Sequence, residues 1–176
     1  MEKLNQALYL ALNANANAPQ YIVSFAKFMA EWPVGVATLL VTFMVFRQGK
    51  GRKLVIGQLI LTVLLAMIAT YAIRESWYHP RPFVIGLGRT WVAHDPTPSF
   101  PSFHATFLFS LGLALLRTGI GWLGASLILT LGALTAWARV YLGIHFPFDM
   151  IAALVIALVA TLVVGRLPVQ RIKHGE

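Results

Sequence analysis

Two histidines stand out in this sequence because each lies beside residues that suit it to proton or group transfer. His145 precedes Asp149 by four positions, and at the start of a helix this spacing lets the carboxylate hold one ring nitrogen. The other ring nitrogen is then free for nucleophilic attack on phosphorus. His104, two residues after Ser102, is placed to protonate a departing oxygen as a general acid and base.

Three arginines and one helix start could hold the phosphate on which these histidines would act. Pro101 predicts the start of a helix, where the N–H groups of Ser102 and Phe103 and the Ser102 hydroxyl can face an anion. Guanidinium groups offer paired donors to phosphate oxygens, and the arginines expected to form such a clamp are Arg74, Arg81 and Arg139. These residues supply what phosphoryl transfer needs without a metal, so we expect no metal and no cofactor.

Simpler interpretations of the same residues remain open at this point. The stretch from Arg139 to Asp149 could be a polar hairpin that anchors two membrane spans at the headgroup level. His104 and His145 could also be haem or metal ligands in a membrane protein that is not an enzyme. Absorption spectra and metal analysis would distinguish that alternative from an enzyme.

The composition of the chain is that of an integral membrane protein. Of 176 residues, 58% are hydrophobic and only 11% are charged. Backbone groups in lipid must bond internally, and uninterrupted apolar runs of about 20 residues select helices over a barrel. We therefore predict a single all-α domain over residues 1–176, a polytopic transmembrane helix bundle. The absence of cysteine excludes disulfides and thiol catalysis.

The breaker residues divide the chain into about five spans and one interfacial helix. Gly143 can end one helix in the left-handed conformation, and Pro147 fits the first turn of the next, so we expect a hairpin there. Residues 1–18 carry an apolar stripe typical of an amphipathic helix on the membrane surface. The expected spans cover residues 21–46 (kinked at Pro33), 54–73, 101–116, 120–141 and 147–164, with a long functional loop over 74–100.

The net charge of +8 reflects membrane topology and does not require a nucleic-acid partner. Basic residues cluster in one short loop and in the tail, as expected for segments kept on the cytoplasmic side: Arg47, Lys50, Arg52, Lys53, Arg166, Arg171 and Lys173. Counting spans from these clusters puts the 74–100 loop and the 139–149 hairpin together on the outer face. We expect a plasma-membrane protein with a cytoplasmic C-terminus and a site facing the periplasm or the exterior.

Three stretches together resemble the type 2 phosphatidic acid phosphatase superfamily of membrane lipid phosphatases. Its pattern is Lys-x6-Arg-Pro, Pro-Ser-x-His and Ser-Arg-x5-His-x3-Asp. The corresponding residues here run from Arg74 to Pro82, from Pro101 to His104 and from Ala138 to Asp149, with every spacing matched over about residues 54–165. The residue types differ at Arg74 and Ala138, where the pattern has Lys and Ser, and Phe103 takes a place often held by a smaller residue.

The resemblance implies a metal-independent phosphatase that forms a phosphohistidine on His145. It also implies that Asp149 orients His145 and that His104 serves as the acid and then as the base for the hydrolytic water. The small size, the five spans and the outward-facing site of this chain resemble those of the bacitracin-resistance type of undecaprenyl-diphosphate phosphatase. That resemblance implies undecaprenyl diphosphate as the substrate. The alternatives are transfer to an acceptor lipid and another substrate, such as lipid A, phosphatidate or phosphatidylglycerol phosphate.

Overall fold

The computed structural model describes residues 1–49 and 51–166, which form seven α-helices, one short 3-10 helix and no strands. Lys50, Arg171 and Lys173, used above to orient the chain, lie outside the described residues, as does the C-terminus. The helices are α1 (Glu2–Leu12), α2 (Gln20–Glu31), α3 (Pro33–Arg47), α4 (Arg52–Ser76), η1 (Pro82–Ile85), α5 (Phe103–Thr118), α6 (Trp122–Tyr141) and α7 (Pro147–Arg166). The all-helical prediction is confirmed.

Three helices in the described part of the chain are long and apolar enough to cross a membrane alone: α4, α6 and α7. The pair α2 and α3 passes the same test as one broken span, bent by 49° immediately before Pro33. Proline suits the first turn of α3, where its missing N–H has no helical partner in any case, and the chain bends there as predicted. The remaining apolar helix, α5, has only 16 residues.

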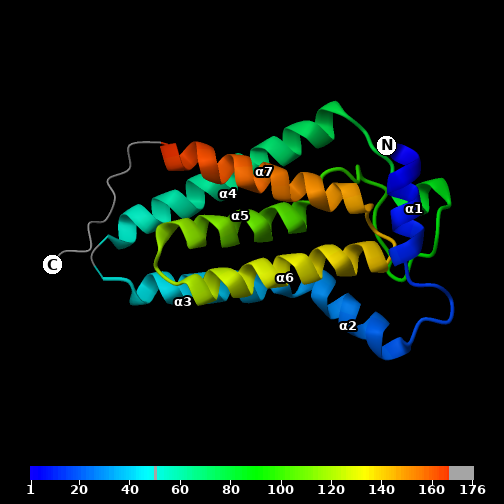
Figure 1. The fold of residues 1–176 in the computed structure, drawn as a ribbon, viewed down its shortest axis with the longest axis horizontal. Helices are drawn as coiled ribbons and strands as arrows, with labels where there is room; N and C mark the ends of the chain where they lie inside the picture. Colours follow the sequence, from blue (N-terminus) through cyan, green and yellow to red (C-terminus); the bar gives the residue numbers. More distant parts are fainter. Residues whose placement is uncertain (50, 167–176) are drawn as a thin grey trace.

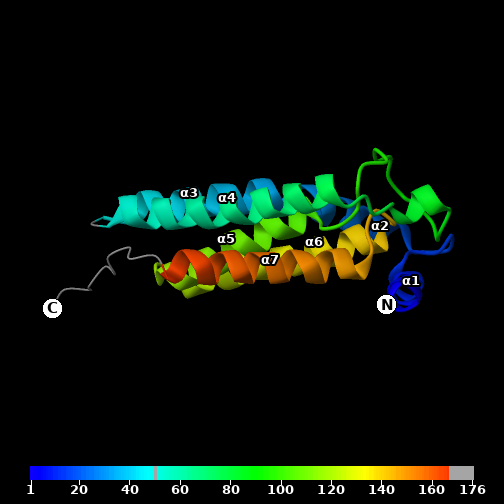
Figure 2. The ribbon, with the colours of Figure 1, turned by 90° about the horizontal axis from the view of Figure 1, so that it is seen from above.

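The short helix α5 occupies the centre of the bundle. Figure 1 and Figure 2 show α3, α4, α6 and α7 running lengthwise around it. Small and apolar residues along α5, from Ala105 to Leu115, are buried against these neighbours. The outer faces of the surrounding helices expose leucine, isoleucine, valine and phenylalanine, which is the reverse of a water-soluble surface. A central helix with lipid-facing neighbours fits the predicted transmembrane bundle.

Helix α1 lies across one end of the bundle instead of along it (Figure 1, Figure 2). Its leucines, including Leu4 and Leu8, are exposed, whereas Asn5 and Tyr9 are buried against the rest of the protein. The amphipathic character expected for this segment is present, and its polar side faces the protein. The chain then turns at Asn13–Asn17 before entering α2.

Three helix ends differ from their sequence-based expectations. Arg74 belongs to the last turn of α4 and not to the following loop, because α4 continues to Ser76. Helix α5 starts at Phe103, with Ser102 as its N-cap residue, so Pro101 precedes the helix instead of opening it. Arg117 and Thr118 extend α5, and the turn falls on Gly119, which has the left-handed conformation at φ 73°.

Candidate functional site

A polar pocket of about 340 Å³ opens at the end of the bundle where α1 lies. It is the meeting point of α4, the 77–102 loop, the start of α5, the end of α6 and the hairpin before α7. Its lining includes six residues expected from the sequence to act on phosphate: Arg74, Arg81, Phe103, His104, Arg139 and His145. The three separate stretches of sequence therefore meet around one cavity.

The hairpin between α6 and α7 positions His145 at the base of this pocket. Gly143 has φ 83°, which reverses the chain after α6, and α7 begins at Pro147. The N–H groups of Ile144 and His145 donate to the carbonyl of Arg139, which closes the turn. His145 is only 2% exposed. The two breaker residues found in the sequence thus form the predicted hairpin.

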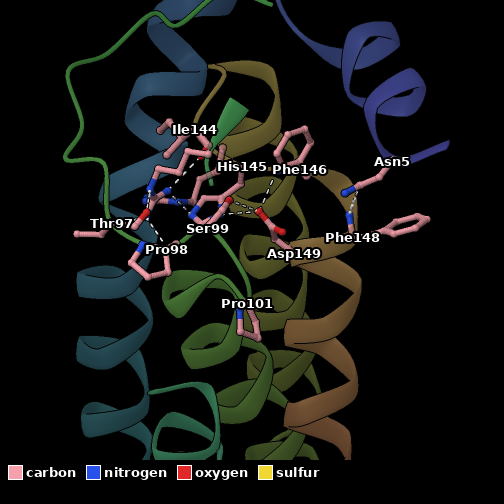
Figure 3. A network of polar contacts seen from close by, with 12 residues as sticks. Asn5, Thr97, Pro98, Ser99, Pro101, Ile144, His145, Phe146, Phe148 and Asp149 are labelled. Carbon is pink, nitrogen blue, oxygen red and sulfur yellow. Dashed lines mark hydrogen bonds and ion pairs between the residues drawn. The ribbon is translucent and has the colours of Figure 1, made fainter. Parts of the chain in front are cut away.

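Asp149 and Ser99 hold one nitrogen of the His145 ring, as Figure 3 shows. Nδ1 of His145 lies 3.0 Å from Oδ2 of Asp149 and 3.2 Å from Oγ of Ser99. The Ser99 hydroxyl and the N–H of Phe146 also donate to Oδ2 of Asp149. Because a carboxylate can only accept, Nδ1 carries the ring proton and Nε2 keeps its lone pair.

Arg81 lies against the free nitrogen of His145. Its Nη1 is 3.1 Å from Nε2 of His145 and donates to the carbonyl of Ile144 at 3.1 Å. Its Nε donates to the carbonyl of Thr97 at 2.9 Å, and its Nη2 donates to the hydroxyl of the same residue at 3.1 Å. The guanidinium is therefore anchored to the loop on one side and faces Nε2 of His145 on the other.

Two further arginines, Arg74 and Arg139, also line the pocket and add positive charge to it. Arg74 donates to the carbonyl of Pro101 at 2.9 Å and lies over the ring of Phe103, with 4.6 Å from Cζ to the ring centroid. Arg139 donates to the carbonyl of Ala30 at 3.0 Å. The bend before Pro33 leaves the end of α2 beside the end of α6, where this contact forms.

His94 and Glu31 flank Arg139. Its Nη2 lies 3.4 Å from Nε2 of His94, and its Nη1 lies 3.8 Å from Oε1 of Glu31, whose side chain is 64% exposed. An ion pair so open to solvent contributes little energy. The Ala30 carbonyl is therefore the more important constraint on the position of this guanidinium.

The two remaining predicted residues have different surroundings. His104 lines the same pocket from the first turn of α5. Ser102 is fully buried, its N–H donates to the carbonyl of Asp149 at 3.4 Å, and its hydroxyl has no partner among the described residues. Ser102 is not among the residues that line the pocket. Its expected role as a phosphate ligand stays a prediction.

Burial and neighbouring positive charge shift the titrating groups in the loops of the site. Desolvation, followed by the charges of Arg139 and Arg81, holds the pKa of His145 well below its usual value of 6.5. Desolvation also lowers the pKa of Arg81 to about 10, with further lowering by Arg74 and Arg139. The pKa of His94 is lowered mainly by burial. His145 is thus a neutral imidazole at neutral pH, and Arg81 remains charged.

The structure brings to the site three loop residues that the sequence motifs do not indicate: Thr97, Ser99 and His94. Thr97 anchors Arg81, Ser99 donates to Asp149, and His94 lies against Arg139. The 74–100 loop was expected to be functional, but its residues follow no helical or strand period that would indicate which side chains point inward. Among the described residues, no group of three or more His, Asp or Glu side chains could hold a metal ion.

The arrangement defines a class of protein, a polytopic helical membrane protein with an anion pocket of arginines and histidines at one end. The chain belongs to the PAP2 superfamily, whose family model matches residues 55–173. It is therefore a membrane phosphatase, and the resemblance seen in the sequence is confirmed. The interpretation of His104 and His145 as ligands in a non-enzymatic protein is set aside.

Individual relatives agree with this assignment. The chain is 32% identical over 163 residues to the Escherichia coli protein named "Putative undecaprenyl-diphosphatase YbjG", covering 92% of this chain and 81% of that protein. It is 28% identical to undecaprenyl-diphosphatase BcrC of Bacillus subtilis, with 89% and 80% covered. The crystal structure of Aquifex aeolicus LpxE shares the fold, with a TM-score of 0.74 at 24% identity over 93% of this chain and 95% of that one.

Proposed function

We propose that this protein hydrolyses undecaprenyl diphosphate to undecaprenyl phosphate and inorganic phosphate through a phosphohistidine on His145. The names of two relatives supply the substrate. The observation that supports the mechanism is that the two ring nitrogens of His145 have different surroundings. Nδ1 is held by Asp149, and Nε2 is directed at a pocket lined by three arginines. A neutral, oriented imidazole beside an anion site is what attack on phosphorus requires.

In the first step, Nε2 of His145 attacks the terminal phosphorus and the bond to the bridging oxygen breaks. His104 gives its proton to that oxygen, and undecaprenyl phosphate leaves. The new N–P bond places positive charge on the imidazole ring, and the Asp149 carboxylate at Nδ1 stabilises that charge. Arg74, Arg81 and Arg139 bind the equatorial oxygens on which the negative charge is spread.

In the second step, water attacks the phosphohistidine from the side that the leaving group has vacated. His104, now neutral, takes a proton from this water, the N–P bond breaks, and inorganic phosphate departs. Nε2 of His145 regains its lone pair, and His104 is again protonated for the next cycle. No step requires a metal, because the guanidinium groups supply the positive charge.

We place this reaction at the outer face of the plasma membrane. The basic residues Arg47, Arg52 and Lys53 lie at the end of the bundle opposite the pocket (Figure 1). Positive loops favour the cytoplasmic side, which puts the pocket at the other surface. A diphosphate headgroup in the outer leaflet would then reach His145 without crossing the bilayer.

The direct test is phosphate release by the purified protein in detergent with undecaprenyl diphosphate alone. We expect release without an acceptor lipid and no loss of rate with a chelator. His145→Ala is expected to abolish release and the acid-labile phosphoenzyme, whereas His104→Ala should slow poor leaving groups most. No phosphate release, with formation of phosphorylated lipid A when that acceptor is added, would indicate transfer instead of hydrolysis. Faster turnover of phosphatidate or phosphatidylglycerol phosphate would reassign the substrate.

A further inference from the structure

The helix that carries Asp149 starts without an N-cap side chain of its own. The first N–H groups of any helix lack partners within it, and a side-chain oxygen of the preceding residue normally accepts one of them. Here the residue before Pro147 is Phe146, which has no acceptor in its side chain. Asp149 reaches back to the N–H of Phe146 at 2.9 Å, which is half of a capping box. The N–H of Phe148 remains to be satisfied.

Asn5 supplies the missing acceptor from the other end of the sequence. Its Oδ1 accepts the Phe148 N–H at 3.1 Å, across 143 positions of chain, and Figure 3 shows this contact beside Asp149. Asn5 is only 2% exposed, so the contact is shielded from water. Asn5 therefore performs, from α1, the task that a serine or asparagine at position 146 would perform locally.

The rest of the buried face of α1 holds Asn5 in place. Tyr9, one turn later, packs edge-on against Phe146 with 5.3 Å between ring centroids, and its hydroxyl donates to Leu87. Asn13, a further turn on, donates to the carbonyls of Arg89 and Tyr141. The three side chains share one face of the segment at spacings of four residues. Helix α1 is thereby joined to the loop, to the end of α6 and to the start of α7.

We propose that Asn5 is a positioning residue for the His145–Asp149 pair, acting as a remote N-cap of α7. Every hydrogen bond to the Asp149 carboxylate falls on Oδ2, while Oδ1 is buried without a partner in the part of the chain that the structure describes. The direction of this carboxylate therefore depends on the first turn of α7. The proposal rests on the proposed function, and it assigns a role to α1, which lies outside residues 55–173 matched by the family model.

Loss of Asn5 should affect the chemical step more than substrate binding. Without the acceptor, the Phe148 N–H is left unsatisfied, and the first turn of α7 loosens around Asp149. The phosphate-binding arginines come from α4, the loop and α6, and the contacts that join α1 to the loop and to α6 are made by Tyr9 and Asn13, so they do not depend on Asn5. A misdirected carboxylate no longer holds Nδ1 of His145 in the attacking orientation, and such small misplacements are costly to rate.

The kinetic test compares three variants of the full-length protein in detergent. Asn5→Leu removes the acceptor at similar size, Asn5→Asp keeps an acceptor at the same place, and Asn17→Leu is the matched control at an exposed asparagine. We expect Asn5→Leu to lower kcat about ten-fold with KM within about two-fold, and Asn5→Asp to recover most of that loss. Unchanged kcat in Asn5→Leu, an equal loss in Asn17→Leu, or no recovery in Asn5→Asp would overturn the proposal.

Hydrogen–deuterium exchange separates this proposal from the proposed function, because it needs no turnover. Peptides that cover residues 146–150 should exchange faster in Asn5→Leu than in the parent or in Asn17→Leu, whereas peptides from α5 and the middle of α6 should not change. Equal exchange in all variants would refute the capping contact. A parent protein that releases no phosphate from any lipid would refute the proposed function and leave the exchange comparison to decide whether the cap exists.

Discussion

His145 presents its two ring nitrogens to opposite charges, and the proposed role of this buried imidazole as a nucleophile depends on that asymmetry. Nδ1 faces the Asp149 carboxylate and Nε2 faces the Arg81 guanidinium. The Arg81 guanidinium contacts Nε2, whose lone pair would attack phosphorus. In the proposed mechanism, an incoming phosphate offers this guanidinium a stronger, charged acceptor, and binding of the phosphate would free Nε2 for attack.

Ser99 should be required for the rate, although no sequence motif marks it. Its hydroxyl donates to the same Asp149 oxygen that holds His145. A hydrogen bond to a charged group contributes roughly 1.5–3 kcal/mol, so Ser99→Ala should lower kcat roughly ten- to a hundred-fold. Steady-state phosphate release measures this, with Ser76→Ala as the control because Ser76 is exposed and bonds only to its own helix. Equal kinetics in the two variants would exclude Ser99 from the site.

The pH dependence of kcat/KM should show an acidic limb unusually far from neutrality. Only the neutral imidazole attacks, and burial holds the pKa of His145 well below 6.5, so activity persists as pH falls through that value and is lost at lower pH. On the alkaline side, activity should fall as His104 loses the proton that it gives to the leaving oxygen. Phosphate release at a series of pH values gives both limbs after correction for substrate ionisation. An acidic midpoint at or above 6.5 would contradict a buried, neutral His145.

At the scale of elements, the α6–α7 hairpin and the 77–102 loop are built against each other. Trp91 donates its backbone N–H to the carbonyl of Leu142 at 3.0 Å, and Asn13 bridges Arg89 and Tyr141. Gly143 lies in the hairpin where it meets this loop and has a positive φ. A Cβ at this position would collide with the carbonyl of Arg89. The absence of a side chain at Gly143 therefore lets the loop that carries Ser99 and Arg81 close onto the turn that carries His145.

Gly143→Ala should consequently separate these two elements. The positive φ alone costs an alanine about 1–2 kcal/mol, and relief of the collision requires the loop to move. We expect a lower unfolding temperature in detergent and a loss of most phosphatase activity. Gly57→Ala is the matched control, since that glycine lies in α4 with open space around it and should be neutral or stabilising by up to about 1 kcal/mol. A Gly143→Ala protein with parental activity would show that this close approach is not needed.

The helices and the hairpin could be predicted from the sequence because each signal is local. Apolar runs mark the spans, and Gly143 and Pro147 determine where the chain turns. Pro101 was misleading for the same reason, because a local rule puts proline at a helix start whereas Ser102 takes the N-cap position and α5 begins at Phe103. The charge of Arg74 predicts that α4 ends before it, but a charged residue can belong to a helix when a distant carbonyl accepts from it, as that of Pro101 does here.

The contacts that complete the site are long-range, and no local pattern reports them. Ser99 reaches Asp149 across 50 positions and Asn5 reaches Phe148 across 143. The sequence shows that the Phe146 side chain cannot cap α7. It does not show which residue supplies the missing acceptor. Arg139 can be recognised from its family motif, but its contact with the Ala30 carbonyl cannot be predicted locally. That contact depends on the bend before Pro33.

At the scale of the molecule, the pocket and the basic α3–α4 connection lie at opposite ends of the bundle. The pocket, the hairpin and α1 lie at one end, and the α3–α4 connection with Arg47, Arg52 and Lys53 lies at the other (Figure 1, Figure 2). Helix α1 lies across the bundle axis at the pocket end, with its leucines exposed. This is the orientation of a helix in the plane of a membrane surface. A lipid headgroup at that surface would be at the level of the arginines.

The orientation in the membrane can be tested with single cysteines, because the chain contains none of its own. Val84→Cys places a thiol on an exposed position in η1 at the pocket end, and Gly49→Cys places one at an exposed position in the opposite connection. Since positive loops stay in the cytoplasm, a membrane-impermeant maleimide should label Val84→Cys on intact cells and Gly49→Cys only after permeabilisation. Retained phosphatase activity in both variants is the control for folding. The reverse labelling pattern would put the pocket in the cytoplasm and exclude hydrolysis of an outer-leaflet lipid.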